Sequence, residues 1–261
     1  MLENWFEGDL KIQVADSPKQ LGANAASHLE KLLKSIIKNK GEARLILATG
    51  TSQFDFLEEL KEKDIEWDKI TVFHLDEYIG LTSDHPASFR NYLKTRILDI
   101  VKPKRVNLLD GDAHSINHEI EEYSSLLKEK PIDIACVGIG ENGHLAFNDP
   151  GVADFNDSNT VKRVELDKAC RQQQFNEGWF PSLDAVPKEA LTLTIPAIMS
   201  ANFISCVVPE LRKAKAVYNA VKGKITDQNP ASILRKHQNS ILFLDRDSAS
   251  FLIKTTSKED V

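Results

Sequence analysis

The glycine-rich segment at residues 138–150, GIGENGHLAFNDP, holds the residues of this chain best suited to chemistry. An apolar run at residues 132–139 leads into it and predicts a buried strand that ends in a sharp glycine turn. His144 follows the turn, with Asn142 before it and Asp149 five residues after it. A histidine oriented by a carboxylate is a general acid–base pair that works near neutral pH. A lone histidine is more often structural, but these neighbours favour a functional role for His144.

The same segment matches the glycine fingerprint of dinucleotide-binding proteins. Gly138, Gly140 and Gly143 fit G-x-G-x-x-G, a pattern that is weak on its own. A dinucleotide-binding turn should lead directly into a long helix, whereas the Asn-Asp-Pro-Gly turn at residues 148–151 interrupts the chain. In addition, no strand about 20 residues later ends in the acidic residue that binds the ribose. We therefore expect no nicotinamide cofactor.

A Thr-Gly-Thr-Ser turn follows another predicted strand, at residues 43–48, and precedes a helix that begins at residue 53 or 54. Hydroxyl and backbone N–H groups at this position suit a phosphate. An ordinary helix N-cap has the same composition, and the sequence leaves both interpretations open. The residues concerned are Thr49, Gly50, Thr51 and Ser52.

Charged residues follow two further strands. Asp76 and Glu77 come after the apolar run at residues 70–75, where a carboxylate either caps the next turn or faces a site. A carboxylate near apolar walls has a raised pKa and can move a carbon-bound proton, so this pair offers a candidate general base. Lys213 follows the run at residues 203–208 and is either solvated or within reach of a phosphate.

Composition excludes several classes of function. The 261 residues carry a net charge of −6 with both signs interspersed, which predicts neither nucleic-acid nor membrane binding. No apolar run approaches the ~20 residues of a membrane helix, and the N-terminal residues lack the apolar core of a signal peptide. Three isolated cysteines indicate reduced thiols in a cytoplasmic protein. His114 and His118 have helical spacing without the glutamate of a zinc motif, so we expect no metal site.

Strand and helix patterns alternate along the chain. Strands are expected at residues 10–14, 43–48, 70–75, 105–109, 132–139, 160–166, 190–195, 203–208 and 241–244. Helices are expected at residues 18–39 after an N-cap at Ser17, from 53 or 54, at 88–100 and 116–128, from 196, and at 212–221 and 230–235. The alternation predicts an α/β fold with a mostly parallel sheet and helices on both faces. Without linkers or repeats, we expect one domain over residues 1–261.

Four motifs in this order resemble the glucosamine-6-phosphate deaminase/isomerase family. They are HLDEYIGL at residues 74–81, the GIGENGHLAFNDP segment, VPKEALTLTI at residues 186–195 and KAKAV at residues 213–217. The similarity runs from about residue 45 to residue 244, and the first two motifs are specific. The resemblance implies a Rossmann-like sheet and a cytoplasmic enzyme of amino sugar metabolism.

The reaction implied by the resemblance needs no metal or cofactor. An amino sugar phosphate opens, isomerises from aldose to ketose, and loses ammonia to give fructose 6-phosphate. Asp76 matches the family's base, which moves a proton between C2 and C1, and His144 matches the acid–base group that opens the ring. Asn142 and Asp149 occupy the positions of the aspartate and glutamate that orient this histidine. The substrate is a small molecule, and the resemblance leaves room for a homo-oligomer.

The phosphate side departs from the family pattern. Lys213 matches the family's phosphate lysine, and residues 49–52 with Gly143 are the other expected substrate contacts. The family's arginine before a Phe-Phe pair is missing, because glycine precedes the aromatic pair at residues 179–180. Arg171 is the nearest replacement in the sequence.

Two other functions stay open at this stage. The 6-phosphogluconolactonases share the fold and a G-x-G-x-D-G-H loop, but that loop continues with Ser-Leu-Phe-Pro where this chain has Phe-Asn-Asp-Pro. They also lack the DEYxGL block. A sugar-phosphate sensor that has lost turnover is the third interpretation. The family's allosteric effector site is poorly matched around residues 161–163, so regulation by an N-acetyl sugar phosphate is not expected.

Overall fold

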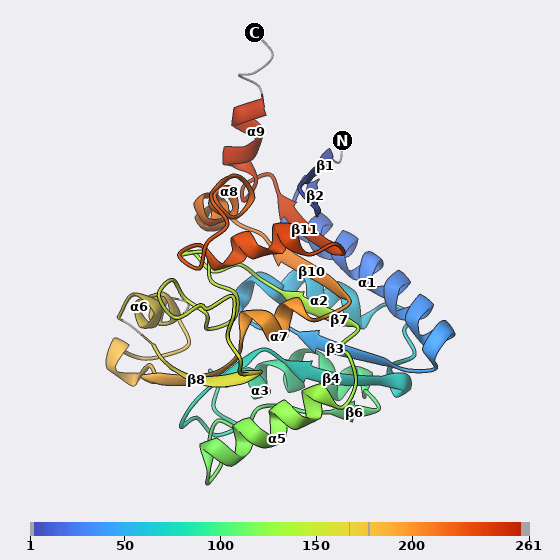
Figure 1. The fold of residues 1–261 in the computed structure, drawn as a ribbon. Helices are drawn as coiled ribbons and strands as arrows, with labels where there is room; N and C mark the ends of the chain where they lie inside the picture. Colours follow the sequence, from blue (N-terminus) through green and yellow to red (C-terminus); the bar gives the residue numbers. More distant parts are fainter. Residues whose placement is uncertain (1–2, 167, 177, 257–261) are drawn as a thin grey trace.

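The computed structural model describes residues 3–166, 168–176 and 178–256, and its main layer is an eight-stranded sheet (Figure 1). The strand order is β1-β2-β11-β10-β7-β3-β4-β6. The edge strand β1 (Glu3–Glu7) is antiparallel to β2 (Leu10–Ala15), and the other neighbouring strands are parallel. These are β3 (Ala43–Leu47), β4 (Ile70–His74), β6 (Arg105–Val106), β7 (Ile134–Val137), β10 (Phe203–Val208) and β11 (Ser240–Asp245).

Helices cover both faces of this sheet. Successive residues of a strand point to opposite faces, so each strand contributes side chains to two cores. Leu45 and Leu47 of β3 belong to a core shared with α1 (Pro18–Lys40), α2 (Phe54–Lys61) and α3 (Phe89–Leu93), whereas Ile46 belongs to the opposite core. That second core is covered by α5 (Ile116–Lys128), α7 (Ile195–Met199), α8 (Ala214–Lys222) and α9 (Ser250–Thr256). The predicted α/β architecture is confirmed.

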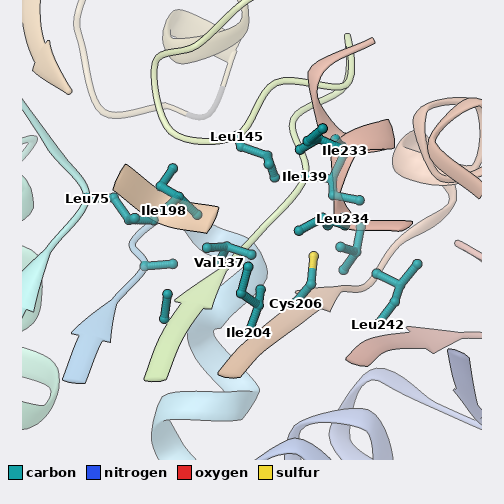
Figure 2. Packing of buried hydrophobic residues seen from close by; sticks show 14 of the residues in the cluster. Leu75, Val137, Ile139, Leu145, Ile198, Ile204, Cys206, Ile233, Leu234 and Leu242 are labelled. Carbon is teal, nitrogen blue, oxygen red and sulfur yellow. The ribbon is translucent and has the colours of Figure 1, made fainter. Parts of the chain in front are cut away.

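Figure 2 shows the second core where it supports the ends of the central strands. Val137 of β7, Cys206 of β10 and Leu242 of β11 pack with Ile198 of α7 and with Leu234 of the 3-10 helix at Pro230–Lys236. Each fully buried aliphatic side chain of this size stabilises the fold by about 1.5–3 kcal/mol. The strand ends from which the candidate loops begin are therefore held by a tightly packed layer.

Local signals mark both ends of α1, and those at its N-terminus act as the sequence predicts. Ser17 is the N-cap, and its hydroxyl accepts a hydrogen bond from the Gln20 backbone N–H at 3.2 Å. Pro18 occupies the first turn, where its missing N–H costs nothing. Gly41 ends the helix with φ 80°, a left-handed conformation that glycine adopts without strain.

A second, three-stranded sheet does not follow from the alternation of strands and helices. It has the order β5-β9-β8 and consists of β5 (Asp76–Tyr78), β9 (Glu189–Leu193) and β8 (Val161–Glu165), all antiparallel. Residues 76–77, which follow the expected strand at residues 70–75, begin β5. Residue patterns predict β8 and β9 as strands, but tertiary contacts determine which sheet they join.

Several boundaries also differ from expectation. The helix expected at residues 88–100 is α3, followed by a π-helical stretch at Lys94–Leu98 and by α4 (Asp99–Val101). The strand expected at residues 105–109 is only Arg105–Val106. The strands and α-helices without any prediction are β1, β5, α9 and α6 (Lys168–Asn176). The polar sequence KACRQQQFN of α6 has no apolar period that could reveal a helix.

Within the described ranges, no helix combines the length and the apolar character that a membrane span requires. The same residues contain no group of three or more His, Cys, Asp or Glu side chains placed to hold a metal ion. Cys136, Cys170 and Cys206 are buried, and within the described residues they form no disulfide.

Candidate active site

A pocket opens at the carboxyl edge of the parallel sheet, the edge at which open α/β sheets bind ligands. Its empty volume, counted with the open mouth, is about 620 Å³. Loops after four strands contribute to its lining, and α6 adds a further wall. The polar contributions are Thr49, Thr51 and Ser52 after β3, Asp76 after β4, His144 after β7, Arg212 and Lys213 after β10, and Gln173 and Gln174 of α6.

His144 and Asp149 form a close acid–base pair. His144 Nδ1 lies 2.9 Å from Asp149 Oδ1, and both side chains are largely buried. Asn142 joins the two residues: its amide donates to Asp149 Oδ1 at 2.7 Å, and its Oδ1 accepts from the His144 backbone N–H at 3.1 Å. Burial alone would raise the pKa of Asp149, but hydrogen bonds and charge from His144, together with Asn142, hold that pKa below its ordinary value. The contact at Nδ1 leaves Nε2 as the nitrogen that can exchange a proton with a ligand.

Backbone shape makes room for this pair. A Cβ built on Gly140 lies 2.1 Å from His144 Cε1, so the imidazole can rest against the backbone only at a glycine. Gly143 has φ +92°, and a Cβ there meets Asn229 Oδ1 at 2.9 Å. Gly143 does not line the pocket in this structure, and its positive φ shapes the turn that carries His144. Ala146 does line the pocket, with a φ of 51° that is unusual for a residue with a side chain, and strained conformations of this kind cluster at functional sites.

Asp76 lines the same pocket with a side chain that is only 7% exposed. In the second sheet it pairs with Thr192 of β9, and Thr192 Oγ1 accepts from the Phe147 backbone N–H at 3.1 Å. The strand β9 therefore fixes both the backbone of Asp76 and the loop that carries His144. Burial, together with the negative charges of Glu77 and Asp149, raises the pKa of Asp76 well above its ordinary value.

Glu77 has a different environment from its neighbour. It is fully buried, is not a lining residue, and accepts hydrogen bonds from Ser88 Oγ at 2.7 Å and from the Arg90 backbone N–H at 2.9 Å. Arg90 Nε lies 3.3 Å from the same Glu77 oxygen. Burial raises the pKa of Glu77, while these hydrogen bonds act in the opposite direction. The two adjacent carboxyls thus divide into a pocket residue, Asp76, and a residue that anchors the start of α3.

The Thr-Gly-Thr-Ser turn lines the pocket with all four of its residues, Thr49, Gly50, Thr51 and Ser52. It leads into a 3-10 turn at Thr51–Gln53 and then into α2, and no side-chain hydrogen bond caps either of them. The interpretation of these hydroxyls as an ordinary N-cap is therefore not supported. Lys213, which is 4% exposed, lines the pocket from the segment after β10, at the same edge of the sheet.

Arg171 does not fill the expected place. Its guanidinium donates to the backbone oxygens of Leu183 at 2.6 Å and Val186 at 3.2 Å, and Arg171 is not a lining residue. In this structure α6 turns Gln173 and Gln174 toward the pocket and directs Arg171 to a neighbouring loop.

Sequence reasoning missed three polar lining residues, Arg212, Gln173 and Gln174. Arg212 had a signal that could have found it, since it directly precedes Lys213 at a predicted strand end. The two glutamines had none, because α6 itself was not predicted. Gln174 Oε1 accepts from the Tyr78 hydroxyl at 2.6 Å, which ties this wall of the pocket to β5.

Comparisons with known proteins identify relatives of this chain. A family model described as glucosamine-6-phosphate isomerases/6-phosphogluconolactonase matches residues 16–243. A glucosamine-6-phosphate deaminase of Lactobacillus delbrueckii subsp. bulgaricus is 33% identical over 93% of this chain and 100% of its own length. One of Streptococcus agalactiae is 34% identical over 88% of this chain and 95% of its own.

Solved structures show the same relationship. A monomeric glucosamine-6-phosphate deaminase has a TM-score of 0.84 and 33% identity, over 92% of this chain and 98% of that protein. A 6-phosphogluconolactonase from Trypanosoma brucei has a TM-score of 0.75 at 19% identity, over 92% of this chain and 98% of that one, and shares the fold.

Fold and site together define a Rossmann-like α/β protein with an acid–base pocket at the carboxyl edge of its sheet. The chain belongs to the family of glucosamine-6-phosphate isomerases and 6-phosphogluconolactonases.

Proposed function

We propose that this protein converts glucosamine 6-phosphate, or a closely related amino sugar phosphate, to fructose 6-phosphate and ammonia. One observation carries the proposal: a carboxylate-oriented imidazole, His144, and a buried carboxyl of raised pKa, Asp76, line the same pocket. Aldose–ketose isomerisation needs these two groups, because one must open the sugar ring and the other must move a proton between adjacent carbons.

Ring opening is assigned to His144. The imidazole transfers a proton between the C1 hydroxyl and the ring oxygen, so that the C1–O5 bond breaks and the C1 aldehyde forms. Asp149 holds Nδ1 and stabilises the protonated imidazole during this step. Asn142, at a position where the resemblance implies an aspartate, donates a hydrogen bond to Asp149. As a neutral amide it adds no negative charge that would repel the Asp149 carboxylate.

Isomerisation and deamination are assigned to Asp76. As a carboxylate it removes the C2 proton while the C1 aldehyde oxygen takes up a proton from water, which gives an enolamine with a C1 hydroxyl. It then returns its proton to C1, which gives an iminium at C2. Water then adds to C2, and ammonia leaves to give the C2 ketone. Burial raises the pKa of Asp76, which makes its carboxylate a stronger base than an exposed one.

Binding of the 6-phosphate is assigned to the hydroxyls of Thr49, Thr51 and Ser52 and to the Lys213 ammonium, all of which line the pocket. We also propose that the chain is a single domain, acts in the cytoplasm on a small molecule, and needs no nucleic acid or membrane partner. Only proton transfers and the addition of water are required, so the proposed reaction involves no redox cofactor.

A panel assay tests the proposal against its two alternatives. Purified protein is given 2-amino-2-deoxyhexose 6-phosphates and, separately, 6-phosphogluconolactone. The deaminase interpretation predicts ammonia from at least one amino sugar phosphate. Hydrolysis of the lactone without ammonia release would favour the lactonase interpretation, and binding without turnover of either compound would favour a sensor.

A further inference from the structure

Arg212 lines the pocket from the 3-10 turn that follows β10. Its Nη2 donates to Thr51 Oγ1 at 3.0 Å, and its Nη1 lies 2.9 Å from Glu141 Oε1. Thr51 follows β3 and Glu141 follows β7, so one guanidinium connects loops from three strand ends. The guanidinium of Arg212 is therefore held by side chains of two other loops and does not extend freely into solvent.

The turn before Arg212 has an unusual backbone conformation that a buried carboxylate stabilises. Glu210, two residues earlier, has φ 81°, which is strained for a residue with a side chain. Its backbone N–H donates to Asp245 Oδ2 at 3.0 Å, and Asp245 is 1% exposed. The other oxygen of Asp245 accepts from the Ser248 backbone N–H at 2.7 Å. A buried carboxylate therefore holds the turn in a conformation that brings Arg212 and Lys213 to the pocket together.

The distribution of charge in the pocket points the same way. Among the lining residues that the structure describes, arginine and lysine side chains come only from Arg212 and Lys213, while α6 contributes the neutral Gln173 and Gln174. The hydroxyl of Thr51 lies beside Arg212. Adjacent cations and a hydroxyl match the charge and the acceptor oxygens of a phosphate dianion.

We infer that Arg212 is the arginine that binds the phosphate group of the substrate, with Lys213 and Thr51 as its neighbours. The inference rests on the proposed function in one respect, that the ligand is a sugar phosphate. The planar fork of Arg212 can give two parallel N–H···O bonds to phosphate oxygens, which the point charge of a lysine cannot. When phosphate binds, its oxygens replace Glu141 and Glu210 as partners of the guanidinium.

Calorimetric titration with inorganic phosphate tests this assignment without relying on turnover. The variants are Arg212→Ala, Arg212→Gln and Arg212→Lys, each checked by thermal unfolding. Lys215→Ala is the matched control, because it removes one exposed positive charge from the next turn of the same segment, outside the pocket lining. Arg212→Ala and Arg212→Gln should weaken phosphate binding by roughly ten- to a hundredfold, and Arg212→Lys should weaken it less. Lys215→Ala should bind phosphate like the wild type.

The outcomes separate this inference from the proposed function. Phosphate binding that is lost in the Arg212 variants supports the inference even if no amino sugar phosphate is deaminated, in which case only the proposed function fails. If ammonia is released, Arg212→Ala should raise KM for the phosphorylated substrate far more than it lowers kcat. A folded Arg212→Ala or Arg212→Gln protein with wild-type phosphate affinity would overturn the inference. So would a wild-type protein that binds no phosphate at millimolar concentration.

Discussion

The imidazole of His144 lies so close to the backbone of Gly140 that a Cβ on Gly140 would sit 2.1 Å from His144 Cε1. Real atoms cannot approach so closely, so Gly140→Ala must displace the imidazole from its place beside Asp149. We predict that Gly140→Ala lowers kcat by roughly 10²–10⁴-fold, the range expected when general acid–base catalysis is lost. Steady-state ammonia release measures this loss.

A double-mutant cycle supplies the control. In a His144→Ala background the methyl group that Gly140→Ala introduces has no imidazole to displace, so this second substitution should cost little further activity. Losses that multiply in the double variant would show that Gly140 acts through something other than His144.

Asp76→Asn keeps the size of the side chain but removes the proposed base. We predict a decrease in kcat of roughly 10²–10⁴-fold with little change in KM. Exchange of the sugar C1 or C2 proton with solvent, followed by NMR in D₂O, should disappear together with turnover. Exchange at the wild-type rate would contradict the assignment of Asp76.

The same substitution should affect stability in a pH-dependent way. The pKa of Asp76 is raised in the folded protein, so unfolding releases its proton between the unfolded and folded pKa values. The wild type therefore loses stability as the pH rises through this window. Asparagine has no carboxyl group that titrates, so the Asp76→Asn variant does not show this loss. Asp76→Asn should raise the free energy of unfolding in urea at pH 8, and the gain should vanish near pH 4. A constant difference at both pH values would contradict the raised pKa.

Glu77→Ala should have the opposite effect on stability. Glu77 is buried with Arg90, and its loss leaves the Ser88 hydroxyl and the Arg90 backbone N–H without their acceptor. Removing one partner of a buried ion pair costs about 3–5 kcal/mol, which urea unfolding can measure. If Glu77→Ala instead retained full stability and lost proton exchange, Glu77 would replace Asp76 as the candidate base.

Arg171→Ala tests whether Arg171 contributes to phosphate binding. The substitution removes two hydrogen bonds to the carbonyl oxygens of Leu183 and Val186, so we predict a loss of about 1–3 kcal/mol in unfolding free energy. The preference for phosphorylated over unphosphorylated amino sugars, measured as a ratio of kcat/KM values, should stay unchanged. A collapse of this ratio would return Arg171 to the phosphate site.

The parallel sheet could be predicted because its strands are short apolar runs that end in glycine or polar turns, as at residues 43–48 and 132–139. The loop from Gly140 to Asp149 could be predicted for a related reason, since its chemistry is contiguous in sequence. The pairing of His144 with Asp149 and Asn142 needs only local contacts across a few residues.

Contacts between distant segments could not be predicted. Asp76 owes its place to the pairing of β5 with β9, more than a hundred residues later, and no local pattern encodes that partner. Proximity in sequence to the missing arginine suggested Arg171, whereas the arginine that reaches the pocket comes from the end of β10. The unpredicted helix α6 determines which of its polar residues line the pocket, because it turns only some of them inward.

The most direct test of the proposed function is a product balance on wild-type protein and glucosamine 6-phosphate, without added metal or nucleotide. Ammonia and fructose 6-phosphate are measured in the same reaction over time. The proposed mechanism predicts that both form in equal amounts, and that Asp76→Asn lowers the rates of both by the same roughly 10²–10⁴-fold factor. Well-folded wild-type protein that releases neither product from any amino sugar phosphate, or fructose 6-phosphate without ammonia, would contradict it.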